Sequence, residues 1–373
     1  MQKLRSSSSA EEVAGSIDTL SEILLRLPAK SLLQLKCVCK QWLTLISDPN
    51  FCHSHSLHNS TPCALLLSYS HNLYVLPLTP TSPTRLLSLD FLNRPHLSVV
   101  RSCNGLLLCH SNSTYFVCNP TTRKFHTLTL PSPHQPRALY LAFDPSTSPH
   151  YQLLSLQTLH SQNSHQVPCV FHVYSSKTRS WTHPQASFTA PSEIITASGV
   201  YCKGAIHWCN DADSSLYFNI DDMSLRYWPM PLSDYEWCNR RVDYFGQCGG
   251  RLHLIISIIN QPLEFHVYEG KQDYSAWLLK HHVDVNPMRV EFPELRWGWA
   301  NWALPFYIAC PVEEEKSMLI LLLGGTVLSY CPWNRTWRRA CEFWPGMTIY
   351  DAMAVYMLGP VFQYFENFSS LQT

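Results

Sequence analysis

Glycine and charged residues are both scarce in this sequence. It has 13 glycines in 373 residues, and only 14% of its residues are charged, against about 25% in an ordinary soluble domain. Neither GxGxxG after an apolar run nor GxxxxGK[ST] occurs, so a glycine-rich loop for dinucleotides or phosphates is not expected. Lys+Arg 27 and Asp+Glu 27 cancel. Nucleic acid is therefore not expected as a partner, because its binding depends largely on neutralised phosphates.

A long apolar segment and a secretory leader are also missing. The most apolar segment, 318–327, contains Gly324 and Gly325 and is shorter than the ~20 residues that span a bilayer. Residues 1–16 are polar and serine-rich, and we expect them to be a disordered leader. The 15 cysteines lie mostly in apolar, strand-like runs, which favours reduced thiols. We expect no membrane partner and a location in the cytoplasm, the nucleus or both.

Apolar residues recur at helical spacing over residues 17–57. The first series begins at Ile17, with Ser16 or Asp18 available as N-cap, and Pro28 ends it. A second series runs over 32–46 and ends at Asp48. Two or three short helices are predicted. A module of this size rarely buries enough surface to be stable alone, so we expect it to dock on a partner.

This segment resembles an F-box, the module that joins ubiquitin-ligase receptor subunits to a Skp-type adaptor and, through it, to cullin and RING subunits. The resemblance is carried by Leu20, Ile23-Leu24, Arg26-Leu27-Pro28, Leu32-Leu33, Cys37-Val38-Cys39-Lys40 and Trp42. The sequence departs at Ile17-Asp18, where many members have Leu-Pro. The resemblance implies that the adaptor is bound by Leu20, Ile23, Leu24, Leu27, Pro28, Leu32, Leu35, Val38 and Trp42.

From residue 62 onward, short β-rich runs alternate with turn signals. One unit recurs as TYFVCNPTTRKF, VFHVYSSKTRSW, LYFNIDDMSLRYW, FHVYEGKQDYSAW and VLSYCPWNRTW. The units end at Phe125, Trp181, Trp228, Trp277 and Trp337, which lie 56, 47, 49 and 60 residues apart. This spacing is close to the ~50 residues of a kelch blade. It predicts a six- or seven-bladed kelch-like β-propeller over 62–373, closed by residues 352–356, so that the chain is mainly β with a small N-terminal α module.

The segments SCNGLLLC, GVYCKGAIHWC and FGQCGGRLHLI precede several units and are predicted to form the inner strands of blades. With CNPTTRKF and LAFDPSTSPHYQLL, they resemble the F-box-associated domain of plant F-box proteins over roughly 100–290. The two resemblances together imply a substrate-recognition subunit of an SCF-type ubiquitin ligase. Such a subunit is not itself an enzyme, and it holds a target protein near a ubiquitin-charged enzyme carried by other chains.

Competing chemistry has little support in the sequence. Cys52, His53, His55 and His58 lie close together, but no second ligand pair at zinc spacing follows. No GxSxG elbow is present. We therefore expect no metal and no cofactor. Two alternatives stay open: an F-box scaffold or sensor that degrades nothing, and a ligand-binding or oxidase-type propeller with a vestigial F-box.

Two segments rich in Trp, Tyr and Arg are candidates for binding the target, because these residues dominate interface hot spots. The alternative is that these aromatic side chains fill the contacts between blades. The candidate residues are Tyr235, Trp237, Arg240, Arg241, Arg296, Trp297 and Trp299. The low charge fits a propeller whose strands pack on both faces, and with zero net charge it predicts poor solubility for the isolated chain.

Overall fold

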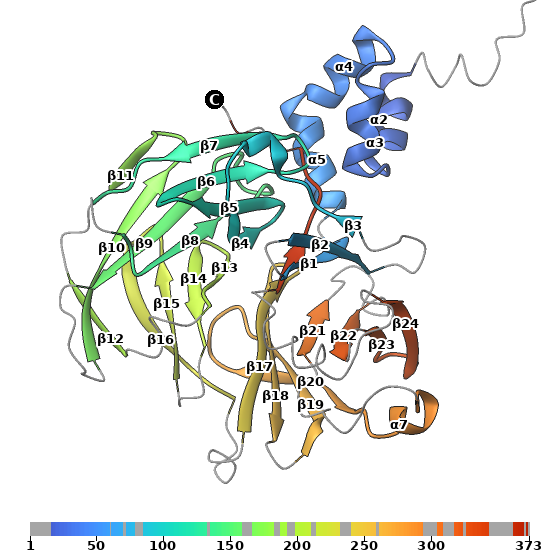
Figure 1. Ribbon diagram of the computed structural model, residues 1–373, viewed down its shortest axis with the longest axis vertical. Helices are drawn as coiled ribbons and strands as arrows, with labels where there is room; N and C mark the ends of the chain where they lie inside the picture. The colour runs from blue at the N-terminus through green and yellow to red at the C-terminus, as the bar shows by residue number, and fades with distance from the viewer. Residues whose placement is uncertain are drawn as a thin grey trace, which may run out of the picture.

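The computed structural model describes residues 16–59, 61–69, 72–78, 85–132, 135–158, 166–182, 187–191, 198–209, 214–231, 240–258, 261–293, 304–308, 317–323, 326–342, 361–368 and 371. Within this part of the chain, a bundle of short helices is followed by six β-sheets (Figure 1). The predicted change from helix to strand near residue 60 is confirmed.

Short helices make up the N-terminal module: α2 (Ile17–Leu25), α3 (Ala29–Leu35), α4 (Lys40–Ser47) and α5 (Pro49–His58). Ser16, one of the two candidates offered by the sequence, is the N-cap of α2, and its side chain accepts the N–H of Thr19. The sequence pattern does not predict α5. Its start signal is nevertheless present, because the Asp48 carboxylate accepts the N–H of Asn50 at 2.8 Å and Pro49 occupies the first turn.

The six sheets are formed from strands that follow one another along the chain, apart from the first sheet, which also takes in the last strand. In chain order the strands are β1 (Ala64–Tyr69), β2 (Asn72–Pro77), β3 (Arg85–Leu86), β4 (Ser98–Cys103), β5 (Leu106–Ser111), β6 (Thr114–Asn119), β7 (Lys124–Leu128), β8 (Ala138–Ala142), β9 (Gln152–Thr158), β10 (Gln166–Ser175), β11 (Ser180–Thr182) and β12 (Phe188–Pro191). The second half contains β13 (Val200–Cys202), β14 (Ala205–Trp208), β15 (Ser214–Asn219), β16 (Ser224–Pro229), β17 (Arg240–Cys248), β18 (Arg251–Ile258), β19 (Gln261–Gly270), β20 (Trp277–Asp284), β21 (Leu304–Ile308), β22 (Met318–Leu323), β23 (Thr326–Cys331), β24 (Thr336–Glu342) and β25 (Val361–Tyr364). Two short helical turns, η1 (Asp90–Leu92) and α7 (Met288–Glu291), lie between blades.

The sheets form a closed ring. The blades are numbered from one to six by their innermost strands, which are β25, β4, β8, β13, β17 and β21, and each of these strands contacts the next. Between the sixth blade and the first, β24 contacts β2, and Ile320 shares a core with Leu65. The first sheet has the order β25-β1-β2-β3, so its innermost strand comes from the C-terminal part of the chain, with Ala64 opposite Tyr364. This arrangement is a six-bladed β-propeller, which confirms the predicted fold class and fixes the number of blades. The predicted closing segment, 352–356, lies outside the described residues, and the strand that closes the ring is β25.

The repeated sequence unit is the outer hairpin of a blade. In four of the five units the final aromatic pairs with the residue seven positions earlier, as Trp181 does with Tyr174. In the fourth blade this place belongs to Leu225, opposite Phe218. Identifying Trp228 as the end of this unit is therefore wrong, because the equivalent residue, Leu225, lies three positions earlier. Trp228 resembles the final Trp of the other units only in residue type.

The final tryptophan of a unit connects neighbouring blades. Trp181 donates from Nε1 to the carbonyl oxygen of Thr129 at 2.6 Å, just after the outer strand of the second blade. Trp277 makes the same bond to Pro229 at 3.0 Å, at the end of the outer strand of the fourth blade. These two tryptophans therefore hold neighbouring blades together.

Inner hairpins carry the predicted glycine turns. The β4–β5 turn has φ of 43° at Asn104 and 89° at Gly105, and Lys203-Gly204 and Gly249-Gly250 repeat the pattern of two positive φ values. Two-residue turns of this kind match the twist of an antiparallel hairpin. At Gly105 a side chain would also overlap the side chain of Asn367, so this turn is fitted to the C-terminal segment.

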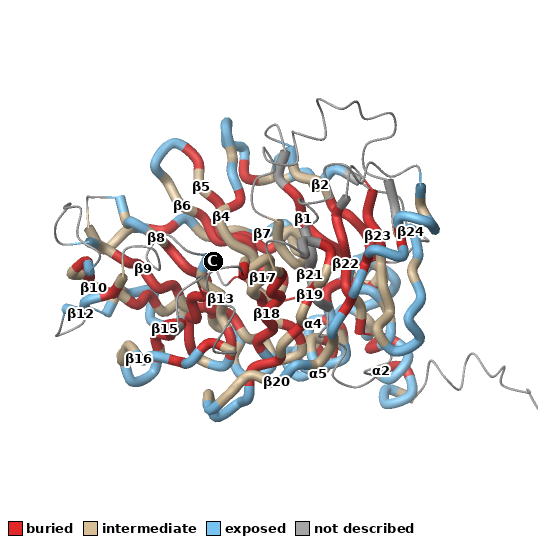
Figure 2. The backbone as a smooth tube through the Cα atoms, turned by 90° about the horizontal axis from the view of Figure 1, so that it is seen from below, coloured by how far each residue is buried: buried red, intermediate tan, exposed pale blue. Residues whose placement is uncertain are grey.

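Buried residues lie mainly in the strands, while many of the turns are exposed (Figure 2). The ring of Phe171 in the third blade is tilted against that of Phe218 in the fourth, with centroids 4.6 Å apart, and Tyr140 meets Trp208 edge-on at 5.3 Å. Strands that are buried on both faces leave few places for charged residues. The low charge of the sequence follows from this packing.

Candidate functional site

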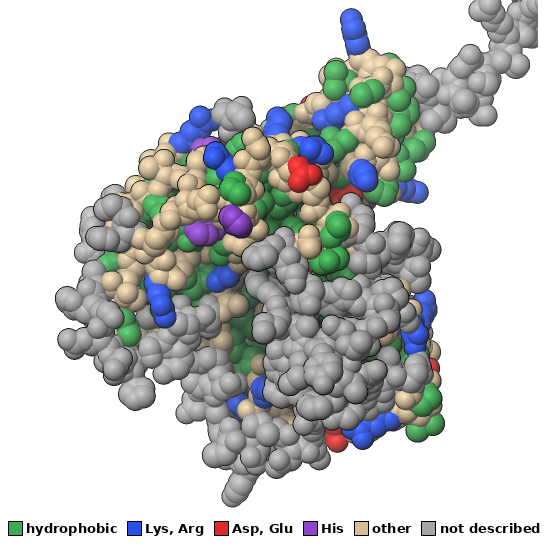
Figure 3. Space-filling view, viewed as in Figure 1, with side chains coloured by type: hydrophobic (Ala, Val, Ile, Leu, Met, Phe, Trp, Pro, Cys, Tyr) green, Lys and Arg blue, Asp and Glu red, His purple; other side chains and the backbone are tan. Residues whose placement is uncertain are grey.

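The helical module exposes several large apolar side chains. Val38 is 60% exposed, Ile17 57%, Leu43 47% and Ile23 46%. Figure 3 shows hydrophobic side chains on the outer part of this module, interspersed with Lys and Arg. An exposed apolar surface of this kind marks an interaction site.

Three of the predicted adaptor-binding residues are in the interior of the module. Leu20, Leu24 and Leu32 are buried in one core with Ile46 and Phe51. Their side chains stabilise the fold of the module, and adaptor contact by them would require the module to open.

The other predicted adaptor-binding residues reach the surface to different extents. Ile23, Pro28 and Val38 are exposed, while Leu27, Leu35 and Trp42 are half-buried. Adaptor binding by these residues stays a prediction. The exposed ones are able to contact a partner without any rearrangement of the module.

Helix α5 and the C-terminal segment join the module to the propeller (Figure 1). Phe368, which follows β25, is buried in the core of the helical module, with its ring 5.0 Å from that of His55 and 5.6 Å from Nζ of Lys36. His55 Nε2 donates to the carbonyl oxygen of Leu27 at 2.8 Å. On the other side of α5, His53 Nδ1 donates to the carbonyl oxygen of Pro145 at 3.1 Å.

Three asparagines fix the C-terminal segment on the propeller. Asn119 Nδ2 donates to Oδ1 of Asn367 at 2.9 Å and to its carbonyl oxygen at 3.2 Å, and Asn367 in turn donates to the carbonyl oxygen of Asn104. Asn119 and Asn367 are both buried. A buried amide without partners is destabilising, so this network specifies one path for the chain.

Most of the predicted target-binding residues lie outside the described part of the chain: Tyr235, Trp237, Arg296, Trp297 and Trp299. Arg240 is 8% exposed and donates to the carbonyl oxygen of Pro231 at 3.3 Å. Arg241 pairs with Asp243 at 2.6 Å. Both arginines therefore have a structural contact, and their binding of a target stays a prediction.

The two arginines lie on the propeller face remote from the helical module. They begin β17, and the opposite end of this strand leads into the Gly249-Gly250 turn, which lines a pocket together with Leu57 of α5. A strand of this length spans roughly 26 Å at about 3.3 Å per residue. The module and the predicted target-binding face are thus separated by the thickness of the propeller.

The Cys/His group near residue 55 does not converge on one point. His53 and His55 bond to different carbonyl oxygens, and His58 Nδ1 bonds to that of Ser54 at 3.1 Å. In the described ranges, no three His, Cys, Asp or Glu side chains are placed to hold a metal ion. None of the described helices is long and apolar enough to cross a membrane.

Comparisons with known proteins match both parts of the chain. The family model of the F-box domain matches residues 16–54, and that of the F-box associated beta propeller domain matches residues 66–226. An F-box protein of Arabidopsis thaliana is 30% identical over 372 residues, covering 91% of this chain and 88% of the relative. An F-box/kelch-repeat protein of the same plant is 28% identical over 237 residues, covering 56% and 62%.

Proposed function

The chain belongs to the F-box proteins that carry an F-box-associated β-propeller, and on this premise we propose that it is the substrate-recognition subunit of an SCF-type ubiquitin ligase. In this role the F-box module binds a Skp-type adaptor, which connects it to cullin and RING subunits. The propeller binds the target protein. The chain acts in the cytoplasm, the nucleus or both.

The exposed apolar surface of the F-box module is the observation that carries this proposal. Ile23 and Val38 are exposed although the buried leucines already fill the core of the module. Burying one such side chain against a partner contributes roughly 1.5–3 kcal/mol. The exposed Arg26, Lys30 and Lys40 on the same module favour an adaptor surface that carries negative charge.

Separation of the two binding surfaces supports the same role. The junction of α5 with the propeller fixes the F-box on one face, and the predicted target-binding arginines are on the other. A rigid connection between adaptor and target keeps a target lysine at high effective concentration near the ubiquitin-charged enzyme. No bond chemistry is then required from this chain.

Adaptor binding is tested by a pull-down of the full chain with a recombinant Skp-type adaptor. We expect wild type to bind and the double variant Ile23→Asp/Val38→Asp to lose binding at least about tenfold, because two exposed apolar contacts become charged. Val290→Asp is the matched control, since Val290 is 86% exposed on α7 of the propeller. A circular dichroism melt confirms that each variant is folded.

Three other results of these experiments contradict the proposal in whole or in part. Absence of adaptor binding by folded wild type contradicts the receptor function. Binding that survives the double variant places the adaptor on another surface. If the adaptor binds but no protein is ubiquitinated through the propeller, the chain is a scaffold rather than a degradation receptor.

A further inference from the structure

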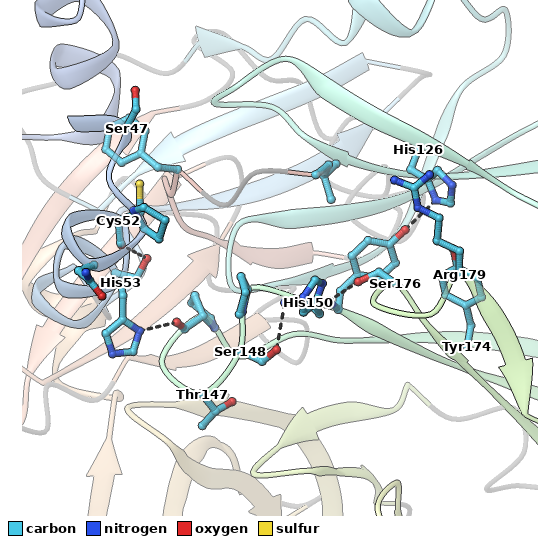
Figure 4. Close-up of a pocket in the computed structure, with 18 residues that line it drawn as sticks. Ser47, Cys52, His53, His126, Thr147, Ser148, His150, Tyr174, Ser176 and Arg179 are labelled. Atoms are coloured by element: carbon cyan, nitrogen blue, oxygen red, sulfur yellow. Dashed lines mark hydrogen bonds between the residues drawn. The ribbon is translucent and has the colours of Figure 1, made fainter. Parts of the chain in front are cut away.

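A pocket between α5 and the propeller has no role in the function proposed above. Its volume is about 320 Å³, within the range of sites that hold small molecules. Helix α5 lines it with Cys52 and His53, and the propeller lines it with His126, Tyr174 and Arg179. Figure 4 shows the α5 residues at one end and Arg179 beside His126 at the other.

The ionisable lining of this pocket is suited to a negative charge. Arg179, His53, His126 and His150 line it, and no Asp or Glu is among the described residues that line it. His126 is held by a 2.9 Å hydrogen bond between its Nδ1 and the Tyr151 hydroxyl. Burial, and after it the positive charge of Arg179, lowers the pKa of His126.

The remaining walls are largely apolar. They are formed by ring and aliphatic side chains from α5, the β8–β9 loop and the C-terminal segment, namely Pro49, Pro145, Pro149, Phe368 and Leu371. Apolar walls with a few convergent polar groups are typical of sites for organic ligands. A free inorganic ion would leave these walls without contacts.

We propose that this pocket binds a small organic anion, a molecule with a carboxylate or phosphate on a ring-sized apolar body. Arg179 holds the anionic group, since a guanidinium matches the geometry of either anion. The apolar body lies against the proline and Phe368 side of the pocket. Because both α5 and the propeller line it, the ligand stabilises the junction between the two parts.

Binding is measured on the full chain by calorimetry and by the shift in melting temperature. The probes are phenyl phosphate and benzoate, with benzamidine as a cation of the same ring size and inorganic phosphate as an anion without a ring. We expect the two aromatic anions to bind and to raise the melting temperature, and the other two to do neither. Whichever of the two aromatic anions has the higher affinity shows whether the pocket prefers a phosphate or a carboxylate. This test does not depend on the adaptor.

Arg179→Gln is the decisive variant, and Arg123→Gln is its matched control. The two arginines end the equivalent turns of neighbouring blades, with φ of 54° and 56°, but Arg123 does not line the pocket. Loss of Arg179 is expected to weaken anion binding about tenfold, whereas loss of Arg123 leaves it unchanged. Equal binding by Arg179→Gln and wild type overturns the proposal.

Protection of Cys52 locates the ligand in wild type, without any substitution. Cys52 lines the pocket, whereas Cys37 is exposed elsewhere on the F-box module. Phenyl phosphate is expected to slow alkylation of Cys52 by N-ethylmaleimide, and not that of Cys37, as measured on peptides by mass spectrometry. Unchanged labelling of Cys52 in the presence of bound probe, or no saturable binding at millimolar concentration, rules out this site.

Discussion

His207 is a fully buried histidine between the fourth and fifth blades. Its Nε2 is 2.9 Å from the Tyr274 hydroxyl, and its ring stacks with those of Tyr217 and Tyr274 at 5.5 Å. Burial lowers the pKa of His207 to about 4. The folded protein therefore keeps this side chain neutral at a pH where the unfolded chain protonates it.

We predict that stability decreases as the pH falls from about 6.5 to about 4. Across this interval the unfolded chain takes up a proton at His207 and the folded chain does not, so the contribution is fully present above pH 6.5. At pH 5 the loss is about 2 kcal/mol. Burial also lowers the pKa values of His55, His126 and His253, with the same sign.

Urea unfolding at pH 7.5 and pH 5 measures this loss. The variant His207→Gln is expected to reduce the difference between the two pH values by about 2 kcal/mol. His58→Gln is the control, because His58 is exposed on α5. If His207→Gln retains the full pH dependence of wild type, His207 is not its source.

Sequence patterns identify single residues best where one helix or hairpin determines their position. The repeat positions of Phe125, Trp181, Trp277 and Trp337 are of this kind, since each hairpin has its own turn. The sequence does not distinguish Leu24 from Ile23 as core and surface residues. That difference depends on how α2 packs against α5 and Phe368, which is a contact across most of the chain.

Among the elements, helix α5 and strand β25 are not predicted from the sequence, and each has a physical reason. Between Phe51 and Leu57, helix α5 contains only Cys, His and Ser, so no apolar stripe indicates a helix. The helix lies between the F-box core and the propeller and bonds to both. His55 bonds to Leu27 of the helical module, and His53 bonds to Pro145 of the propeller. Strand β25 has four residues, and its partner β1 is near the other end of the sequence.

Removal of β25 tests the ring closure. A chain that ends at residue 360 leaves β1 without its inner neighbour and takes Phe368 out of the F-box core. We expect it to lose the single cooperative unfolding transition, which calorimetry measures. A chain that ends at residue 368 keeps β25 and Phe368 and is the matched control.

Comparing the chains that end at residues 360 and 368 distinguishes loss of ring closure from a general effect of shortening the C-terminus. We expect the longer truncation product to unfold as one unit, because the Asn119–Asn367 hydrogen bonds remain. If the chain ending at residue 360 also unfolds cooperatively at the wild-type temperature, β25 is not needed to close the propeller.

For the whole molecule, zero net charge and an open F-box surface determine behaviour in solution. The sequence pI is about 7.2, so repulsion between copies is weakest near neutral pH. We predict that the isolated chain is least soluble near pH 7 and more soluble at pH 9. Soluble yield at the two pH values, with and without a co-expressed Skp-type adaptor, measures this.

The exposed apolar surface of the F-box module is expected to lower the solubility of the isolated chain independently of its net charge. Ile23→Asp/Val38→Asp is expected to raise the solubility of the isolated chain at pH 7, because it removes exposed apolar area and adds charge. We expect co-expression of the adaptor to give no further increase in the solubility of this variant. Equal solubility of wild type at pH 7 and pH 9 contradicts the charge argument.

Closure by β25 also has a consequence for synthesis on the ribosome. The F-box and first blade emerge early, but β1 has no inner partner until residues 361–364 are made. At roughly 5–20 residues per second this interval lasts tens of seconds. Throughout it, an apolar strand edge is open to other chains and to chaperones. A chain whose translation stops before residue 361 therefore has neither a closed ring nor Phe368 in the core of its F-box module.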